Sequence, residues 1–505
     1  MVDNIVPLII LAVYIVFVVA VGVYARMKSK KATSKDYLTG SGDVNVWVNG
    51  FAIFAAFATG GTMLGNIGLS YAGGWGYITA YNGGVALGYL ITTFFLAKAL
   101  RNMNVATVPE FIRKRFNNKT LNFLVPLILI GTLLAYLVAQ MKVGGMLGEQ
   151  LFGFSYEWSV LGVGVVYIFY TFYGGMRAVT LTDFVQGLLM ISVVVICGGF
   201  ALGANSGAAN LYELATTLRP QWEGTESFPL ASYIGAFVIW ATVNAVLPHT
   251  VMRIFAAKNE RQGRASLAIG LGLYVLTAVV TTVFIVGAVV ILEGGEDLAA
   301  PDTTFLVFLA KQTPTWVAGL AYAGIFAAVM SSVSAMLLAL GGAFAYDLVA
   351  EFKPNMNDRT KRRLTSWSVL GFGVMTLVLS LNPPELLTLL YSAAVGLLAS
   401  GLFFPTLLGV WWKRMNNTGA LAGVIVGTVS YLVLLWGTAM PALSQVTVSL
   451  PLSLVACVVG SLVTKPPRPE ELSRITIAHE REFVEADEEL SAETNAELAS
   501  DRKDK

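Results

Sequence analysis

Two adjacent hydroxyl side chains, Ser331 and Ser332, interrupt an apolar stretch that runs from Trp316 to Val349. The local sequence is AAVMSSVSAM. A helix that is buried in lipid needs only hydrocarbon side chains, so the two hydroxyls require an explanation. Adjacent helical residues point about 100° apart, so one hydroxyl can face a site while the other flanks it. Hydroxyl and backbone carbonyl oxygens are ligands that hard cations prefer. A set of neutral oxygens without carboxylates suits a monovalent ion such as sodium.

The serine pair also has a purely structural interpretation. A serine hydroxyl inside a helix can donate to the carbonyl one turn earlier, which satisfies it without any ligand. For a lone serine in a membrane helix, this packing role is the more common one. The residues by themselves leave both interpretations open.

A cation site of this kind needs free backbone carbonyls nearby, and residues 58–68 are a candidate source. Their sequence, ATGGTMLGNIG, places Gly60 and Gly61 beside two threonines inside an apolar stretch. Glycine marks positions where membrane helices approach closely or unwind. Unwound backbone is tolerated there only where it is buried in protein or lines a cavity, and its carbonyls can then bind cations.

The composition determines what surrounds these motifs. The chain has 505 residues, 56% of them hydrophobic and 13% charged, whereas a soluble protein carries about 25% charged residues. The mean hydropathy is +0.68. The two cysteines, Cys197 and Cys457, lie in apolar runs and predict no disulfide framework. Metalloprotease, serine-hydrolase and C-x-x-C motifs are absent, so we expect a multi-pass protein of the lipid bilayer that is not an enzyme.

Thirteen segments are long and apolar enough to cross a bilayer, which takes about 20 residues each. We expect them at 5–25, 46–72, 79–100, 120–146, 157–174, 182–204, 231–252, 265–292, 315–349, 366–382, 385–412, 418–439 and 447–464.

The distribution of basic residues predicts the orientation, because lysine and arginine favour the cytoplasmic side. With the N-terminus outside, 29 of the 33 lysines and arginines fall in cytoplasmic segments. We therefore expect a plasma-membrane protein with its N-terminus outside and its C-terminus in the cytoplasm. The charged tail, 465–505, is expected to be solvated, and no nucleic acid or obligate protein partner is indicated.

Six segments resemble the sodium:solute symporter family in order and spacing, and the similarity runs from about residue 5 to 464. They are YLTGSGDVNVWVNGFAIFAAFATGGTMLG (38–65), AQMKVGGMLGEQLFG (139–153), YTFYGGMRAVTLTDFVQGLLM (170–190), VLPHTVMRIF (246–255), AAVMSSVSAMLLALGGAFAYDL (327–348) and NNTGALAGVIVGTVSY (416–431).

The resemblance implies an all-α integral membrane protein with the leucine-transporter fold, in which two five-helix repeats have inverted topology. The implied organisation is an extra N-terminal helix and loop at 1–45, the repeats at 46–204 and 231–412, two further helices at 418–464, and the tail.

The resemblance also implies a sodium ion as the coupling ion. Carried over by position, the family's shared sodium site falls on the hydroxyls of Ser331 and Ser332 and on the carbonyls of Ala55, Ala58 and Ala328. The serines match by residue type, whereas the alanines match by position alone.

Asp183, in TLTDFVQG, matches an aspartate that many family members hold near the inner end of the fifth core helix. The resemblance implies that it lies on the sodium exit path. A charge at the edge of a span is a functional candidate in its own right. The alternative is an N-cap for a helix that begins at Phe184.

The resemblance implies uptake of a small organic solute by sodium symport. Segments 139–153 and 246–253 look most like the pantothenate and acetate or monocarboxylate branches, so a small carboxylate is the leading candidate. Symport of proline, a sugar or sialic acid is the alternative, and a membrane sensor with the same fold is the alternative from another class. Polar residues that we expect to face the solute cavity are Thr62, Asn66, Gln140, Trp240 and Asn244.

Overall fold

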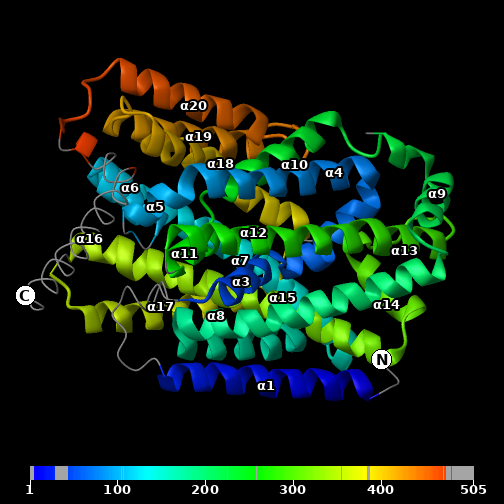
Figure 1. Ribbon diagram of the computed structural model, residues 1–505. Coiled ribbons are helices and arrows are strands. Elements are labelled where there is room, and N and C mark those ends of the chain that lie inside the picture. Colours follow the sequence, from blue (N-terminus) through cyan, green and yellow to red (C-terminus); the bar gives the residue numbers. More distant parts are fainter. Residues whose placement is uncertain are drawn as a thin grey trace, which may run out of the picture.

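The computed structural model describes residues 5–28, 44–103, 105, 107–224, 226–257, 259–353, 355–383, 387–469, 471–473 and 479. Within these ranges the regular secondary structure is helical, apart from one isolated bridge between Val44 and Ala257. The long helices lie side by side in layers, with α1 along one edge and the α19–α20 pair along the other (Figure 1). Most of the predicted tail and of the loop before Asn45 lies outside the described residues.

The first half of the chain contributes the broken helix. Its elements are α1 (Val6–Lys28), α3 (Val46–Phe57), η2 (Gly61–Asn66), α4 (Ile67–Ile91), η3 (Thr92–Leu96), α5 (Ala97–Asn102), α6 (Val108–Phe116), α7 (Lys119–Phe152), α8 (Tyr156–Ala204), α9 (Ala208–Leu218) and η4 (Pro220–Glu223).

The second half carries the serine pair, on α15. Its elements are α10 (Leu230–Val243), α11 (Pro248–Ala256), α12 (Glu260–Ala278), η5 (Val279–Ile285), α13 (Val286–Leu292), η6 (Pro301–Thr303), α14 (Thr304–Gln312), α15 (Thr315–Gly342), η7 (Ala343–Val349), α16 (Ala350–Phe352), α17 (Asp358–Leu379), α18 (Leu387–Trp411), α19 (Asn417–Gly437) and α20 (Val446–Leu462).

Each of the thirteen predicted spans overlaps a helix of the structure. In the described part of the chain, seven helices are long and apolar enough to cross a membrane, and five shorter apolar helices accompany them. The gap that was predicted after residue 72 falls at Gly74, whose φ of 64° interrupts α4. A side chain there would also collide with Trp222, because a Cβ atom would lie 2.6 Å from its ring.

Helix α8 contains both of the helices that were predicted at 157–174 and 182–204. The backbone is helical from Tyr156 to Ala204, but the chain reverses its direction between the two halves. Tyr167 packs on Phe326 and Val193 lies beside Gly324 of α15, whereas 26 residues of a straight helix would separate Tyr167 from Val193 by about 39 Å. Asp183 lies inside the second half, which includes Val179–Ala204, so the N-cap alternative is wrong.

Arg219 joins helix α4 to the loop that follows α13, at the end of the molecule that carries α9 and α14. Its side chain is only 2% exposed and lies over the ring of Tyr71, 4.2 Å from the centroid. It donates hydrogen bonds to the Tyr71 hydroxyl and carbonyl and to the carbonyls of Gly295 and Glu296, at 2.6 to 3.1 Å. An ion pair with Asp297 completes this cluster, which we call the Arg219 hub.

Candidate ion and solute site

The first core helix breaks between α3 and η2. Helix α3 ends at Phe57, and Ala58 has a non-helical ψ of 71°. Thr59 closes the break, because its Oγ1 accepts from the Thr62 amide at 3.1 Å. Thr62 in turn donates its hydroxyl to the Phe57 carbonyl at 3.1 Å. The expected unwinding is therefore present, one or two residues before the glycine pair.

Gly60 explains why the break lies against α15. A Cβ atom at this position would lie 2.5 Å from Cγ2 of Val329 and 3.0 Å from Cγ1 of Val143. Contacts below 3.0 Å require something to move, so only glycine permits this approach. The broken helix, α7 and α15 therefore meet at one point, directly beside the serine pair.

The serine hydroxyls meet the backbone oxygens of two helices. Ser331 Oγ donates to the Ala55 carbonyl of α3 at 2.8 Å and lies 3.1 Å from the Ala328 carbonyl. Ser332 Oγ donates to the Ala328 carbonyl at 2.8 Å. All four residues are fully buried. The structure thus gathers four of the five residues that were predicted to hold sodium, and every converging atom is a neutral oxygen.

The two serines differ in what they contribute to the packing. Ser332 makes the hydrogen bond to the carbonyl four residues earlier, as a packing serine does. Ser331 reaches across to α3, a contact between residues 276 positions apart in the chain. Ala58 is buried at the end of α3, where its carbonyl no longer belongs to a regular helix. A cation at this point would replace hydroxyl hydrogen bonds with ion–oxygen contacts.

A small cavity lies next to the break. It is lined by Ala56, Phe57, Thr59, Thr62, Tyr81, Val85, Tyr136, Trp240, Leu247 and Tyr274, and its volume is about 10 Å³. That is about the space of one water molecule, whereas solute pockets measure roughly 300 to 1,000 Å³. The helices around it must separate before an organic solute can enter.

The predicted solute residues divide into two groups. Thr62 and Trp240 line the cavity, while Gln140, Asn66 and Asn244 lie outside its lining. Asn244 donates to the Val85 carbonyl at 3.2 Å and so ties the end of α10 to α4. Gln140 lies against the break, because a Cβ atom on Gly60 would be 3.1 Å from its Oε1.

Gln140 and Asn66 are buried amides, at most 1% exposed. Among the residues that the structure describes, neither side chain has a hydrogen-bond partner for its oxygen or its nitrogen. A buried polar group without a partner costs about 1–3 kcal/mol, so such groups need an explanation. Both amides are free to bind something that the folded chain does not itself supply.

Sequence reasoning missed the aromatic part of the cavity wall. Tyr81, Tyr136 and Tyr274 come from α4, α7 and α12, and all are buried. The ring centroids of Tyr81 and Trp240 are 5.0 Å apart. Tyrosines are frequent throughout this chain, and which of them face inward depends on helix rotation, so no sequence signal singled these out.

Asp183 has a charged partner that the sequence did not indicate. Its carboxylate forms an ion pair with Arg253 of α11, and both side chains are fully buried. Arg253 also donates to the Thr180 hydroxyl at 2.6 Å, and its carbonyl accepts from Asn49 of α3 at 3.0 Å. This ion pair therefore connects α8 and α11 to the same broken helix that carries Ala55.

The architecture and the site define a class of protein. Helices that are apolar enough to cross a membrane surround a broken helix. A carbonyl of this helix meets a serine hydroxyl, and two amides without partners in the described part of the chain lie at or beside the break. These are the features of an ion-coupled transporter, in which the ion and the solute bind beside interrupted helices.

Comparison with known proteins identifies the family. Residues 37–427 match the model of the sodium:solute symporter family, and the chain belongs to it. The chain is 28% identical to the osmoregulated proline transporter of Bacillus subtilis, over 90% of this chain and 94% of that protein. It is 29% identical to the sodium/pantothenate symporter of Haemophilus influenzae, over 89% of this chain and 95% of that one.

Solved structures confirm the expected fold. A sodium-coupled sialic acid symporter in a substrate-bound, outward-open state matches with a TM-score of 0.76 at 19% identity, over 92% of this chain and 99% of that one. A nucleobase-cation-symport-1 family transporter in a closed conformation matches with a TM-score of 0.54 at 15% identity, over 87% and 97%. The protein is thus a sodium-coupled solute symporter of the leucine-transporter fold and not an enzyme.

Proposed function

We propose that the chain takes up a small organic carboxylate, a short monocarboxylate or a pantothenate-like acid, together with sodium. The contact that carries the proposal is the one between Ser331 Oγ and the Ala55 carbonyl, because it couples the broken helix to α15. Proline and pantothenate, after which the two relatives are named, are both carboxylates. This shared chemistry supports an acid over a neutral sugar.

A carboxylate would need compensation for its charge in this site. The described lining of the cavity contains hydroxyl and aromatic groups but no lysine, arginine or histidine. The remaining sources of positive potential are the bound sodium and the backbone amides at the start of η2, where a helix N-terminus favours anions. Gln140 contributes an amide N–H donor that has no other partner in the described part of the chain. In this proposal, solute and ion stabilise one another.

Sodium occupancy is expected to favour the solute-competent conformation. Its ligands would be Ala55, Ala58, Ala328, Ser331 and Ser332, which belong to separate helices that move during alternating access. An ion shifts such an equilibrium only by its difference in affinity between the two states. Crossing a potential of 100 mV, one sodium contributes about 2.3 kcal/mol, in addition to its concentration gradient.

The experiment is uptake into proteoliposomes of labelled acetate, pyruvate, pantothenate, proline and glucose, with and without an inward sodium gradient. We expect acetate, pyruvate or pantothenate to accumulate with the gradient and to equilibrate without it. Accumulation of proline alone would point to the proline alternative, and accumulation of glucose alone to the sugar alternative. Accumulation of an acid that does not depend on sodium would contradict the coupling.

The same proposal places the N-terminus outside and the C-terminus in the cytoplasm of the plasma membrane. The basic-residue distribution supports it. A membrane-impermeant thiol reagent should modify a cysteine introduced at Ser206 and should not reach one introduced at Thr33. The reverse pattern would overturn this orientation and the assignment of the two repeats to 46–204 and 231–412.

A further inference from the structure

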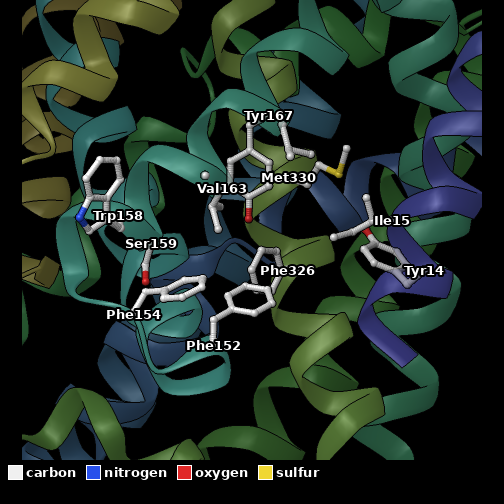
Figure 2. A pocket seen from close by; sticks show the side chains of 12 residues that line it. Tyr14, Ile15, Phe152, Phe154, Trp158, Ser159, Val163, Tyr167, Phe326 and Met330 are labelled. Carbon is white, nitrogen blue, oxygen red and sulfur yellow. The ribbon is translucent and has the colours of Figure 1, made fainter. Parts of the chain in front are cut away.

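A second cavity lies away from the ion site, between α1, the α7–α8 turn, α8 and α15. Its volume is about 240 Å³, and its wall is almost entirely aromatic and aliphatic. Figure 2 shows Phe152, Phe154 and Phe326 along one part of the wall, and Tyr14 and Ile15 reaching in from α1. The candidate solute site shares none of these residues.

The mouth of this cavity opens among side chains that suit the edge of a bilayer. Trp158 is 71% exposed and Phe154 is 61% exposed, and both lie at the turn where α7 gives way to α8. Exposed aromatic residues at helix ends lie at the level of the lipid headgroups. On α1, Val13 and Val16 are exposed and present hydrocarbon to the surroundings. The cavity is therefore open to lipid near the interface.

The wall contains a hydrogen-bond donor that the chain leaves without a partner. Ser159 is 3% exposed, and its hydroxyl has no hydrogen-bond partner among the described residues. Other hydroxyls on the same helix are paired: Thr171 and Ser192 each donate to a carbonyl four residues earlier at 2.8 Å. Gly148 of α7 packs closely on Ser159, because a Cβ atom at residue 148 would lie 2.9 Å from the Cβ atom of Ser159 and 3.4 Å from its Oγ.

The position of Ser159 along α8 sets the kind of ligand. It is three residues from the start of the helix at Tyr156, which is the depth of ester groups rather than of hydrocarbon chains. Tyr167, whose buried hydroxyl is also without a partner in the described part of the chain, lies about 12 Å deeper at 1.5 Å per residue. Between them the cavity offers apolar side chains only, and it ends against Phe326 and Met330 of α15.

We propose that this cavity binds one acyl chain of a membrane phospholipid, with the ester carbonyl accepting a hydrogen bond from Ser159 and the methylenes packed against Phe326 and Met330. A bound chain would lie between α1, α8 and α15. It would contact α15 at Met330, the residue that directly precedes Ser331. The ligand is therefore an ester-linked aliphatic chain that enters sideways from the bilayer.

The test uses the full-length protein in phosphatidylcholine vesicles that contain phosphatidylcholine with a diazirine in one acyl chain. After illumination, peptide mass spectrometry should find adducts on Phe326 or Met330. These side chains are only 3% and 2% exposed, so bulk lipid does not reach them. Adducts confined to exposed residues such as Val429 and Val433 would show bulk lipid only and would overturn the proposal.

Gly162 provides a way to fill the cavity, and Gly199 on the same helix provides the control. Both glycines are exposed, and a Cβ atom at either meets no heavy atom within 4 Å, but only Gly162 lines the cavity. We expect Gly162→Phe to reduce the Phe326 and Met330 adducts at least fivefold and Gly199→Phe to leave them unchanged. Equal adduct yields in the two variants would contradict a bound chain.

Ser159→Ala tests the ester contact with little risk to folding. Loss of one hydrogen bond should lower the adduct yield a few-fold and leave the adducts on exposed residues as they were. Competition by unlabelled lipids separates the sources of the chain. Diacyl phosphatidylcholine should displace the label, whereas displacement only by a free fatty acid or an alkyl detergent would overturn the phospholipid assignment.

Discussion

The Arg219 hub and the region around Gln140 treat buried polar groups in opposite ways. Arg219 places its guanidinium among four hydrogen bonds, a carboxylate and an aromatic face. Gln140 and Asn66 are as deeply buried, yet their amides have no partner in the described part of the chain. The polar groups of the Arg219 hub are therefore used for rigidity, whereas the two amides beside the break are the ones that we propose for binding.

Removal of the Arg219 hub should have the largest effect on stability. Arg219→Met takes away charge-assisted hydrogen bonds worth roughly 1.5–3 kcal/mol each, so we expect a loss of about 3 kcal/mol or more. The measurement is the thermal unfolding midpoint in detergent. Lys311→Met is the control, because the ion pair of Lys311 with Glu293 is half exposed and contributes at most about 1 kcal/mol. Equal midpoints for the two variants would show that the hub is not a stabilising centre.

The serine pair should dominate the sodium dependence. Ser331→Ala and Ser332→Ala each remove one proposed ligand oxygen, so the half-saturating sodium concentration should rise at least several-fold. By linkage, solute affinity should fall at limiting sodium and recover partly at high sodium. Uptake is measured against sodium concentration and normalised to protein in the membrane. If both variants keep the original half-saturation and only their abundance falls, the serines are packing residues.

Asp183→Asn should slow turnover more than it weakens solute binding, because Asp183 is proposed to lie on the sodium exit path. It contacts Arg253 and not the cavity lining. Solute affinity at saturating sodium should remain within a few-fold of the original. The asparagine also leaves Arg253 without its counter-charge, so stability is measured in parallel. A collapse of affinity with normal turnover would replace the exit-path assignment with a binding role.

Gln140→Leu should produce the opposite pattern to the Arg219 variant. An amide without partners gives up no hydrogen bond when it is replaced by an apolar side chain of similar size, so stability should change by less than about 1 kcal/mol or increase. Uptake should nevertheless show a several-fold higher KM for the solute. Thr171→Val on α8 is the control, because it removes another buried hydroxyl, one that does not line the cavity. A normal KM in Gln140→Leu would remove Gln140 from the solute site.

Substitution of Asp302 should have the smallest effect on stability, and this effect should depend on pH. Asp302 lies in η6, between α13 and α14, where burial raises the pKa of its carboxyl and nearby Lys142 partly opposes this shift. A raised folded-state pKa means that the folded protein binds the proton more tightly. Stability therefore falls as pH rises from the ordinary aspartate pKa of about 3.9 through the higher folded value. Asp302→Asn should remove that fall, which unfolding midpoints measured across the acidic range would show.

The sequence located the parts of the site that depend on residue type. A hydroxyl pair in an apolar run and a glycine pair beside threonines are conspicuous, and they indicated Ser331 and the break near Ala58. The sequence did not show what depends on helix rotation and on distant partners. Tyr81, Tyr136 and Tyr274 face the cavity because of how three helices pack, and Arg253 meets Asp183 only in three dimensions.

The Arg219 hub also has a consequence for how the protein is made. Tyr71 leaves the ribosome 148 residues before Arg219, and Glu296 follows 77 residues after Arg219. At a synthesis rate of about 5–20 residues per second, Arg219 waits roughly 4–15 s for its last partners. The first half of the chain is thus inserted before the Arg219 hub is complete. The bonds of Arg219 to Gly295, Glu296 and Asp297 form only after the second half has been translated. A stop codon between the halves would leave a fragment in which Arg219 lacks the partners that the second half supplies, and a quality-control protease can recognise such an incompletely folded region.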